Sequence, residues 1–209
     1  MHHNYGCNIL DLINFASITA GHSFRGKIPE TKGSGIYVVQ MKDIDTEYSV
    51  NWNAVVETQL FGRQSANWLQ RGDILFAARG QRNYAVLIGN ELNERLVVAA
   101  PQFFVIRLNQ PRILPEYLAW FLNQPIAQRY FLSKAEGSNT PSIRRQELEV
   151  TPIILPTLRQ QKIIIELAKT ISKEKQLAYK MIANGELLMQ TLLNEISQTQ
   201  LNEEDVPSC

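Results

Sequence analysis

The chain has 209 residues, 44% of them hydrophobic, which suits one globular domain with residues left over for an appendage. Its 21 basic and 20 acidic residues nearly balance, so a nucleic-acid-binding surface would have to be a local patch. Cys7 and Cys209 lack the spacing of a metal site or a disulfide framework, and no apolar run approaches the roughly 20 residues of a membrane span. We therefore expect a cytoplasmic protein without membrane contact, cofactor or metal.

The first 155 residues are expected to form one domain built on a mixed β-sheet. Residues 9–20 are rich in apolar side chains and predict a short buried element, either helix or strand. Residues 21–35 combine several glycines with Pro29 and basic side chains, which is typical of a loop. Residues 35–41 have the composition of a strand, and residues 60–70 are expected to form a short helix.

Four apolar runs predict further strands, at residues 74–78, 84–88, 96–100 and 103–108. Residues 115–131 then carry apolar side chains at helical spacing after a proline, which predicts one helix. Residues 133–141 are expected to form a loop. Residues 143–155 are expected to form a final strand that ends at Pro156.

After Pro156 the composition changes to that of a long helix. From about residue 158 to 198 there is no proline and one glycine, and most residues are good helix formers. Such a helix would be roughly 60 Å long, too long for the preceding domain to cover. We therefore divide the chain into a domain at 1–155 and a region at 156–209, which ends in an acidic tail expected to be disordered. A mainly apolar heptad pattern predicts an interface with another helix through Ile164, Leu167, Ile171, Ala178, Met181, Leu188 and Leu192.

The sequence lacks the usual motifs of transfer and hydrolysis. There is no Asn-Pro-Pro or Asp-Pro-Pro followed by an aromatic residue, no Gly-x-Gly-x-x-Gly after a strand and no Walker loop. One alternative is a metal-dependent nuclease, in which Asp11, Glu30 and Lys32 would supply an acidic pair and a lysine. Because Glu30 and Lys32 lie in a glycine-rich loop rather than on a strand, we expect no catalytic residue.

Three polar, basic segments are candidates for binding double-stranded DNA. Guanidinium groups can fork onto guanine and carboxamides onto adenine, and both can contact phosphates. An ordinary solvated loop has the same composition, but three such loops on one β-rich domain favour DNA binding. The predicted DNA-binding residues are Arg79, Gln81, Arg82, Asn83 and Tyr84 in the first segment, Lys134, Ser138, Asn139, Thr140, Arg144 and Arg145 in the second, and Arg25, Lys27 and Lys32 in the third.

Four short motifs follow one another along the chain. They lie at residues 69–76 (LQRGDILF), 114–122 (LPEYLAWFL), 137–148 (GSNTPSIRRQEL) and 152–163 (PIILPTLRQQKI). In order and spacing, from about residue 9 to 196, this set resembles the specificity subunits of type I restriction-modification systems. The chain departs from that family in having room for one recognition domain and one long helix, where a full subunit has two of each. It also has Arg159 where an acidic residue is commoner.

The resemblance implies an α+β, non-catalytic subunit whose recognition domain reads one DNA half-site. It implies that the long helix pairs antiparallel with a partner helix as a coiled coil, and that separate modification subunits and a restriction subunit carry the chemistry. A homodimer of this kind would read a site that is itself two-fold symmetric. Two alternatives stay open: a recognition module of another DNA-modification or phage-defence system, and a coiled-coil interaction protein that does not bind DNA.

Overall fold

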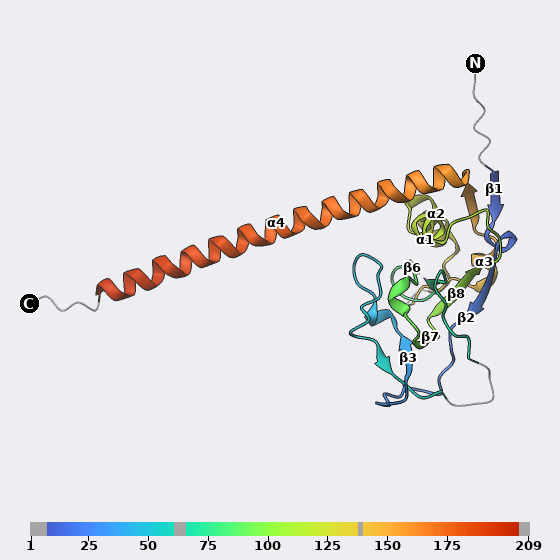
Figure 1. The fold of residues 1–209 in the computed structure, drawn as a ribbon, viewed down its shortest axis with the longest axis horizontal. Coiled ribbons are helices and arrows are strands. Elements are labelled where there is room, and N and C mark those ends of the chain that lie inside the picture. Colours follow the sequence, from blue (N-terminus) through green and yellow to red (C-terminus); the bar gives the residue numbers. More distant parts are fainter. Residues whose placement is uncertain (1–7, 61–65, 138–139, 205–209) are drawn as a thin grey trace, which may run out of the picture. The chain divides into compact units, whose positions relative to one another are not determined.

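The computed structural model describes residues 8–60, 66–137 and 140–204, of which residues 8 and 198–204 are described by their backbone alone (Figure 1). The chain divides into two compact units, Met1–Ile163 and Ile164–Cys209. The first unit holds three small β-sheets and short helices, and the second consists of the greater part of one long helix. The α+β class expected from the sequence is confirmed.

The largest sheet of the first unit has four antiparallel strands in the order β2-β8-β5-β6. Strand β5, one of the two central strands, is buried at all four residues, because both faces of the sheet are covered at this strand. Leu75 and Ala77 join the hydrophobic core cluster shared with the three-stranded sheet, whereas the ring of Phe76 lies 4.8 Å from that of Phe131 on a helix. The strands are β2 (Ala16–Ala20), β8 (Phe103–Leu108), β5 (Ile74–Ala77) and β6 (Ala85–Leu87).

The two smaller sheets combine strands that are far apart in the sequence. In the first, β3 (Ile36–Val39) pairs antiparallel with β4 (Val56–Glu57) and parallel with β7 (Leu96–Ala99). In the second, β1 (Asn8–Asp11) pairs antiparallel with β9 (Pro152–Leu155). The parallel β3–β7 pair makes the sheet mixed, as the sequence led us to expect.

The predicted helix at residues 115–131 is in fact two helices, α1 (Pro115–Leu122) and α2 (Pro125–Lys134). The break falls at Gln124, whose ψ of 154° is extended. Pro125 explains this break, because the ring of a proline disfavours helical geometry in the residue before it. Pro125 is then the first residue of α2, where its missing N–H costs nothing.

Two other predictions about local structure were wrong in part. The final strand is confined to β9, because residues 145–149 form the short helix α3 (Arg145–Glu149), which buries Leu148. The described part of residues 60–70 contains no helix, while residues 61–65 lie outside the described chain. Backbone bonding explains the irregular form of this segment: the N–H of Leu69 donates to the carbonyl of Val97, 2.8 Å away. The buried element predicted at residues 9–20 comprises β1, the 3-10 helix η1 (Leu12–Asn14) and β2. Two further 3-10 helices in the first unit are η2 (Met41–Asp43) and η3 (Asn90–Leu92).

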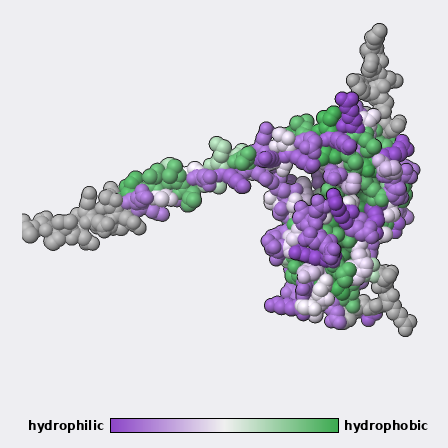
Figure 2. All heavy atoms as spheres, in the orientation of Figure 1, coloured by the Kyte–Doolittle hydropathy of each residue, from purple (hydrophilic) through white to green (hydrophobic). Residues whose placement is uncertain are grey.

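Helix α4 (Leu158–Glu204) has 47 residues and is therefore about 70 Å long. It begins at a capping box, in which the N–H of Gln160 donates to the hydroxyl of Thr157 and the N–H of Thr157 donates to the side-chain oxygen of Gln160. Large apolar side chains are exposed along its length, and Figure 2 shows hydrophobic patches on it. No helix in the described chain combines the length and hydrophobicity needed to span a membrane.

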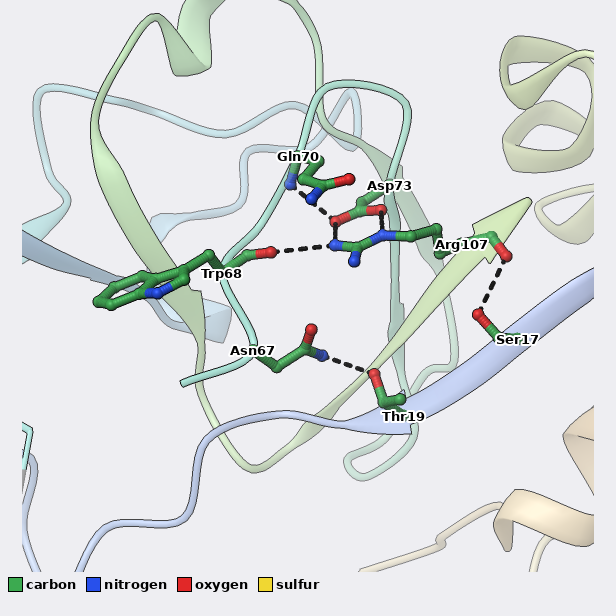
Figure 3. Close-up of polar contacts among 7 residues, drawn as sticks. All are labelled: Ser17, Thr19, Asn67, Trp68, Gln70, Asp73 and Arg107. Carbon is green, nitrogen blue, oxygen red and sulfur yellow. Dashed lines mark hydrogen bonds and ion pairs between the residues drawn. The ribbon is translucent and has the colours of Figure 1, made fainter. Parts of the chain in front are cut away.

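An ion pair between Asp73 and Arg107 joins the turn before β5 to the neighbouring strand β8 (Figure 3). The Arg107 Nε and Nη2 donate to the two carboxylate oxygens at 2.7 and 2.6 Å, and Nη2 also donates to the carbonyl of Trp68 at 2.9 Å. The carboxylate further accepts from the backbone N–H of Gln70. Asp73 is 1% exposed and Arg107 36%, so the pair is only partly screened by water.

Replacing Asp73 with alanine should lower the free energy of unfolding by about 2 kcal/mol, because Arg107 loses its charged partner but regains some hydration. Urea denaturation would measure the loss. The matched control is Glu149→Ala, which removes the Arg145–Glu149 pair, whose side chains are 55% and 20% exposed, and should cost less than about 0.5 kcal/mol. Equal losses in the two variants would contradict a special role for Asp73.

Candidate nucleic-acid interface

Two of the three predicted DNA-binding segments are neighbours in space. Arg79 and Ser142 form an antiparallel β-bridge, and the N–H of Gly80 donates to the carbonyl of Pro141 at 3.2 Å. Gly80 has φ = +125°, a conformation that L side chains rarely adopt, so this contact depends on glycine. The first segment follows directly from β5, and the second is joined to the end of the same strand because the N–H of Ile143 donates to the carbonyl of Ala78. Both loops therefore lie at the same end of β5.

A cleft of about 730 Å³ lies where these two loops meet helix α2. Arg82, Gln128 and Arg129 contribute polar side chains to it, and Leu132 gives it an apolar part. Tyr48, from a loop of the three-stranded sheet region, also lines the cleft. Four separate segments of the first unit thus contribute to one concave surface that carries guanidinium, carboxamide and aromatic groups.

The carboxamides of the cleft mainly hold its walls together. The amide of Asn123 pairs with the backbone of Ala85 in both directions, at 2.9 and 2.8 Å, as a neighbouring strand would. The Nδ2 of Asn83 donates to the carbonyl of Ala77, and the Nε2 of Gln128 donates to the carbonyl of Leu122. Asn83 was predicted to contact DNA, but its amide nitrogen closes the loop that contains Arg82.

Tyr84, another predicted DNA contact, packs within the domain. Its half-buried ring stacks on Tyr48 at 5.5 Å and meets the edge of Phe103 at 6.5 Å. Burial raises the pKa of the Tyr84 phenol, and Tyr48 raises it further. Tyr48 is more exposed, at 39%, and has a φ of +59°, which is uncommon for a residue with a bulky side chain. Of the two rings, that of Tyr48 is the one available to a ligand.

The cations of the second segment are paired with carboxylates of the same chain. Lys134 lies 3.1 Å from Glu147, Arg144 lies 2.5 Å from Glu136, and Arg145 lies 2.7 Å from Glu149. The hydrogen bond to Glu147 raises the pKa of Lys134, which favours the charged form of the lysine in this pair. The remaining predicted residues here are Thr140, which is exposed, and Ser138 and Asn139, which lie outside the described residues.

Arg79, Gln81 and Arg82 of the first segment are exposed. Among the described residues, neither arginine forms an ion pair. The same is true of Arg129 on α2, which sequence analysis did not select. No pattern in the sequence identifies Arg129 as a cleft residue, because its position in the cleft with Arg82 depends on how α2 packs against β5.

The third predicted segment is anchored elsewhere in the first unit. The N–H of Thr31 donates to the backbone carbonyl of Glu57 at 3.0 Å, and the N–H of Gly33 donates to the Glu57 carboxylate. Arg25, Lys27 and Lys32 are exposed on this loop, and none of the described residues that line the cleft comes from it. The structure thus brings two predicted segments together and leaves the third separate.

The nuclease alternative gains no support from the described residues. Within residues 8–60, 66–137 and 140–204, no group of three or more His, Cys, Asp or Glu side chains is arranged to hold a metal ion. Asp11 ends strand β1, opposite Pro152, while Glu30 lies in the loop before β3.

Comparison with protein families decides the classification. Residues 10–184 match the model of the type I restriction modification DNA specificity domain. The chain belongs to this family. Its specificity domain therefore includes both the β-rich unit and the first half of α4. No curated protein matched the sequence.

Solved structures with a similar fold agree with this assignment. The HsdS subunit from Thermoanaerobacter tengcongensis has 23% identity and a TM-score of 0.58, with 92% of this chain and 50% of that one covered. The S subunit of a type I restriction-modification system from M. genitalium has 12% identity and a TM-score of 0.55, with 83% and 41% covered.

A third structure, described as showing complex assembly and conformational transition of the type I R-M system, has 15% identity and a TM-score of 0.64, with 92% and 45% covered. The chain thus spans about half the length of these solved structures.

Asn123→Ala should loosen the edge of β6 and the loop before it, because the Ala85 N–H and carbonyl lose their partner. We expect a loss of about 1–3 kcal/mol in the free energy of unfolding and faster amide exchange at residues 79–86. Hydrogen exchange with mass spectrometry would localise the effect. Asn53→Ala, at an exposed position, is the control and should behave as the unchanged protein. Unaltered exchange at residues 79–86 would show that Asn123 does not hold this loop.

Proposed function

We propose that this chain is a DNA sequence-recognition subunit of a type I restriction-modification complex, which reads one half-site through the loops around the cleft. The observation that carries the proposal is the family match over residues 10–184, since this family is that of the DNA specificity domain. The two adjacent loops support it, because Arg79, Gln81 and Arg82 present side chains suited to base edges and phosphates. The subunit would be non-catalytic and would act on DNA in the cytoplasm.

We propose that α4 joins this chain to a second copy as an antiparallel coiled coil. Six of the seven predicted interface residues are exposed in the single chain, with exposed fractions of 59% for Leu167, 75% for Met181 and 60% for Leu188, whereas Ile164 is half-buried. Exposed apolar side chains at heptad positions are stabilised when a second helix buries them. A helix of about 70 Å is long enough to hold two readers one DNA turn apart, at about 34–36 Å.

We further propose that α4 offers a docking surface for a modification subunit. Ile182, Met189 and Ile196 are exposed and recur every seven residues beside the predicted seam, which widens the apolar stripe. A two-stranded coiled coil needs only a narrow stripe, whereas a wider one suits a bundle with additional helices. A restriction subunit would join the same complex.

The dimer is tested by a substitution in the seam. Leu188→Glu should convert a dimer to a monomer at micromolar concentration, because it places a charge in the buried part of the interface. Analytical ultracentrifugation would measure the change. Gln176→Glu adds the same charge at an exposed position on the opposite side of the heptad and should leave the dimer intact. A monomeric wild-type chain would contradict self-association.

The reading loop is tested at the sequence that the complex modifies, which methylome sequencing of strains with and without the gene would identify. Arg79→Ala should weaken binding to that duplex by about 1–3 kcal/mol for every base that the arginine hydrogen-bonds, and Arg82→Ala should also weaken it, through a lost base or phosphate contact. Titration calorimetry or fluorescence anisotropy would measure this. Arg159→Ala, at an exposed residue of the first turn of α4, is the control. Full affinity in both loop variants would remove the loop from the interface.

The alternatives make different predictions. A recognition module of another DNA-modification or phage-defence system would bind DNA but would modify it with different partner subunits. An interaction protein without DNA affinity would bind no duplex at low salt, whereas DNA binding by the proposed subunit should weaken steeply as salt rises.

A further inference from the structure

We propose that Arg129 and Arg82, which both line the cleft, bind the phosphodiester backbone, whereas Lys134, Arg144 and Arg145 do not. This inference rests on the proposed function, because it takes duplex DNA as the ligand. It assigns to Arg129 a role that its sequence context does not indicate. It also excludes Lys134, Arg144 and Arg145 from the DNA interface, although the composition of their segment had suggested that they contact DNA.

The ion pairs distinguish the two groups of cations. Lys134, Arg144 and Arg145 each lie within 3.1 Å of a carboxylate of the same chain. A phosphate that approached one of them would either displace that carboxylate or be repelled by it. Arg82 and Arg129 form no ion pair among the described residues, so their charge is available to an anionic ligand. Interaction energy with phosphates should therefore be larger at these two cleft arginines than at the three paired cations.

Helix α2 holds Arg129 toward the cleft. Pro125, Gln128, Arg129 and Leu132 all line it, and their spacing of three and four residues places them on one face of the helix. On another face, Ala127 and Phe131 are buried against the domain. Because packing fixes α2, Arg129 is presented by a rigid element rather than by a mobile loop.

The composition of the cleft fits a nucleic acid. Two guanidinium groups at the rim would bind phosphates, and the exposed Leu132 and Tyr48 offer apolar surface for sugars and base edges. The carboxamides of Asn83, Asn123 and Gln128 already donate to backbone carbonyls, so they keep the shape of the cleft. The positive charge of the cleft lining therefore comes from Arg82 and Arg129.

The experiment uses the full chain and a fluorescent duplex of mixed sequence, about 30 base pairs long, titrated at salt concentrations from about 50 to 200 mM. Non-specific binding suffices, because the slope of log affinity against log salt reflects the number of phosphates bound. Arg129→Ala should flatten this slope by about 0.9, so that wild-type affinity falls about 3.5-fold more than that of the variant over the range. Arg82→Ala should behave in the same way.

Two controls make the test decisive. Arg145→Ala removes an exposed arginine that is paired with Glu149 and should keep the wild-type slope. Arg129→Lys keeps the charge and should also keep the slope, because a phosphate contact needs a cation rather than a fork. A wild-type slope in Arg129→Ala, or an equal flattening in Arg145→Ala, would overturn the inference while leaving DNA recognition in place. A wild-type chain that binds no duplex at the lowest salt would overturn both.

Discussion

The ion pair between Asp73 and Arg107 fixes the strand from which the cleft loops extend. Asp73 immediately precedes β5, and Arg107 lies in β8, which pairs with β5 from Ile74 to Ala77. The pair therefore anchors the start of β5 through side chains while the strand itself is held by backbone hydrogen bonds. Because the loop that carries Arg82 follows the other end of β5, its position depends on the register of this strand.

Polar residues around the cleft divide into those that build it and those that are exposed to solvent. Asn123 takes the place of a strand beside Ala85, and Asn83 closes its own loop, so both satisfy backbone groups at the end of the sheet. Arg82 and Arg129 carry charge at the surface instead. A frame of this kind lets the exposed side chains change without altering the fold.

Local rules predicted the fold better than the site. The apolar runs predicted most strands, and the proline-free segment predicted α4, because both patterns depend only on residues that are close in the sequence. The helix break at Gln124 could also be predicted from the sequence, since Pro125 restricts the backbone of the residue before it. In contrast, the carboxylate partner of Lys134 and the position of Arg129 in the cleft follow from tertiary packing, which no local pattern encodes. Composition identified the basic segments but could not separate paired cations from available ones.

The start of α4 is joined to the recognition unit by a buried glutamine. The Oε1 of Gln161 accepts from the N–H of Leu114, while its Nε2 donates to the carbonyls of Arg112 and Pro156. All three backbone groups lie in segments without regular structure, so they have no hydrogen-bond partner in a helix or sheet. The side chain of Gln161 supplies that partner for each of them. The first turn of α4 thus begins at a fixed point of the specificity domain. In the proposed dimer, such an attachment would keep the start of α4 at a defined point of each recognition unit.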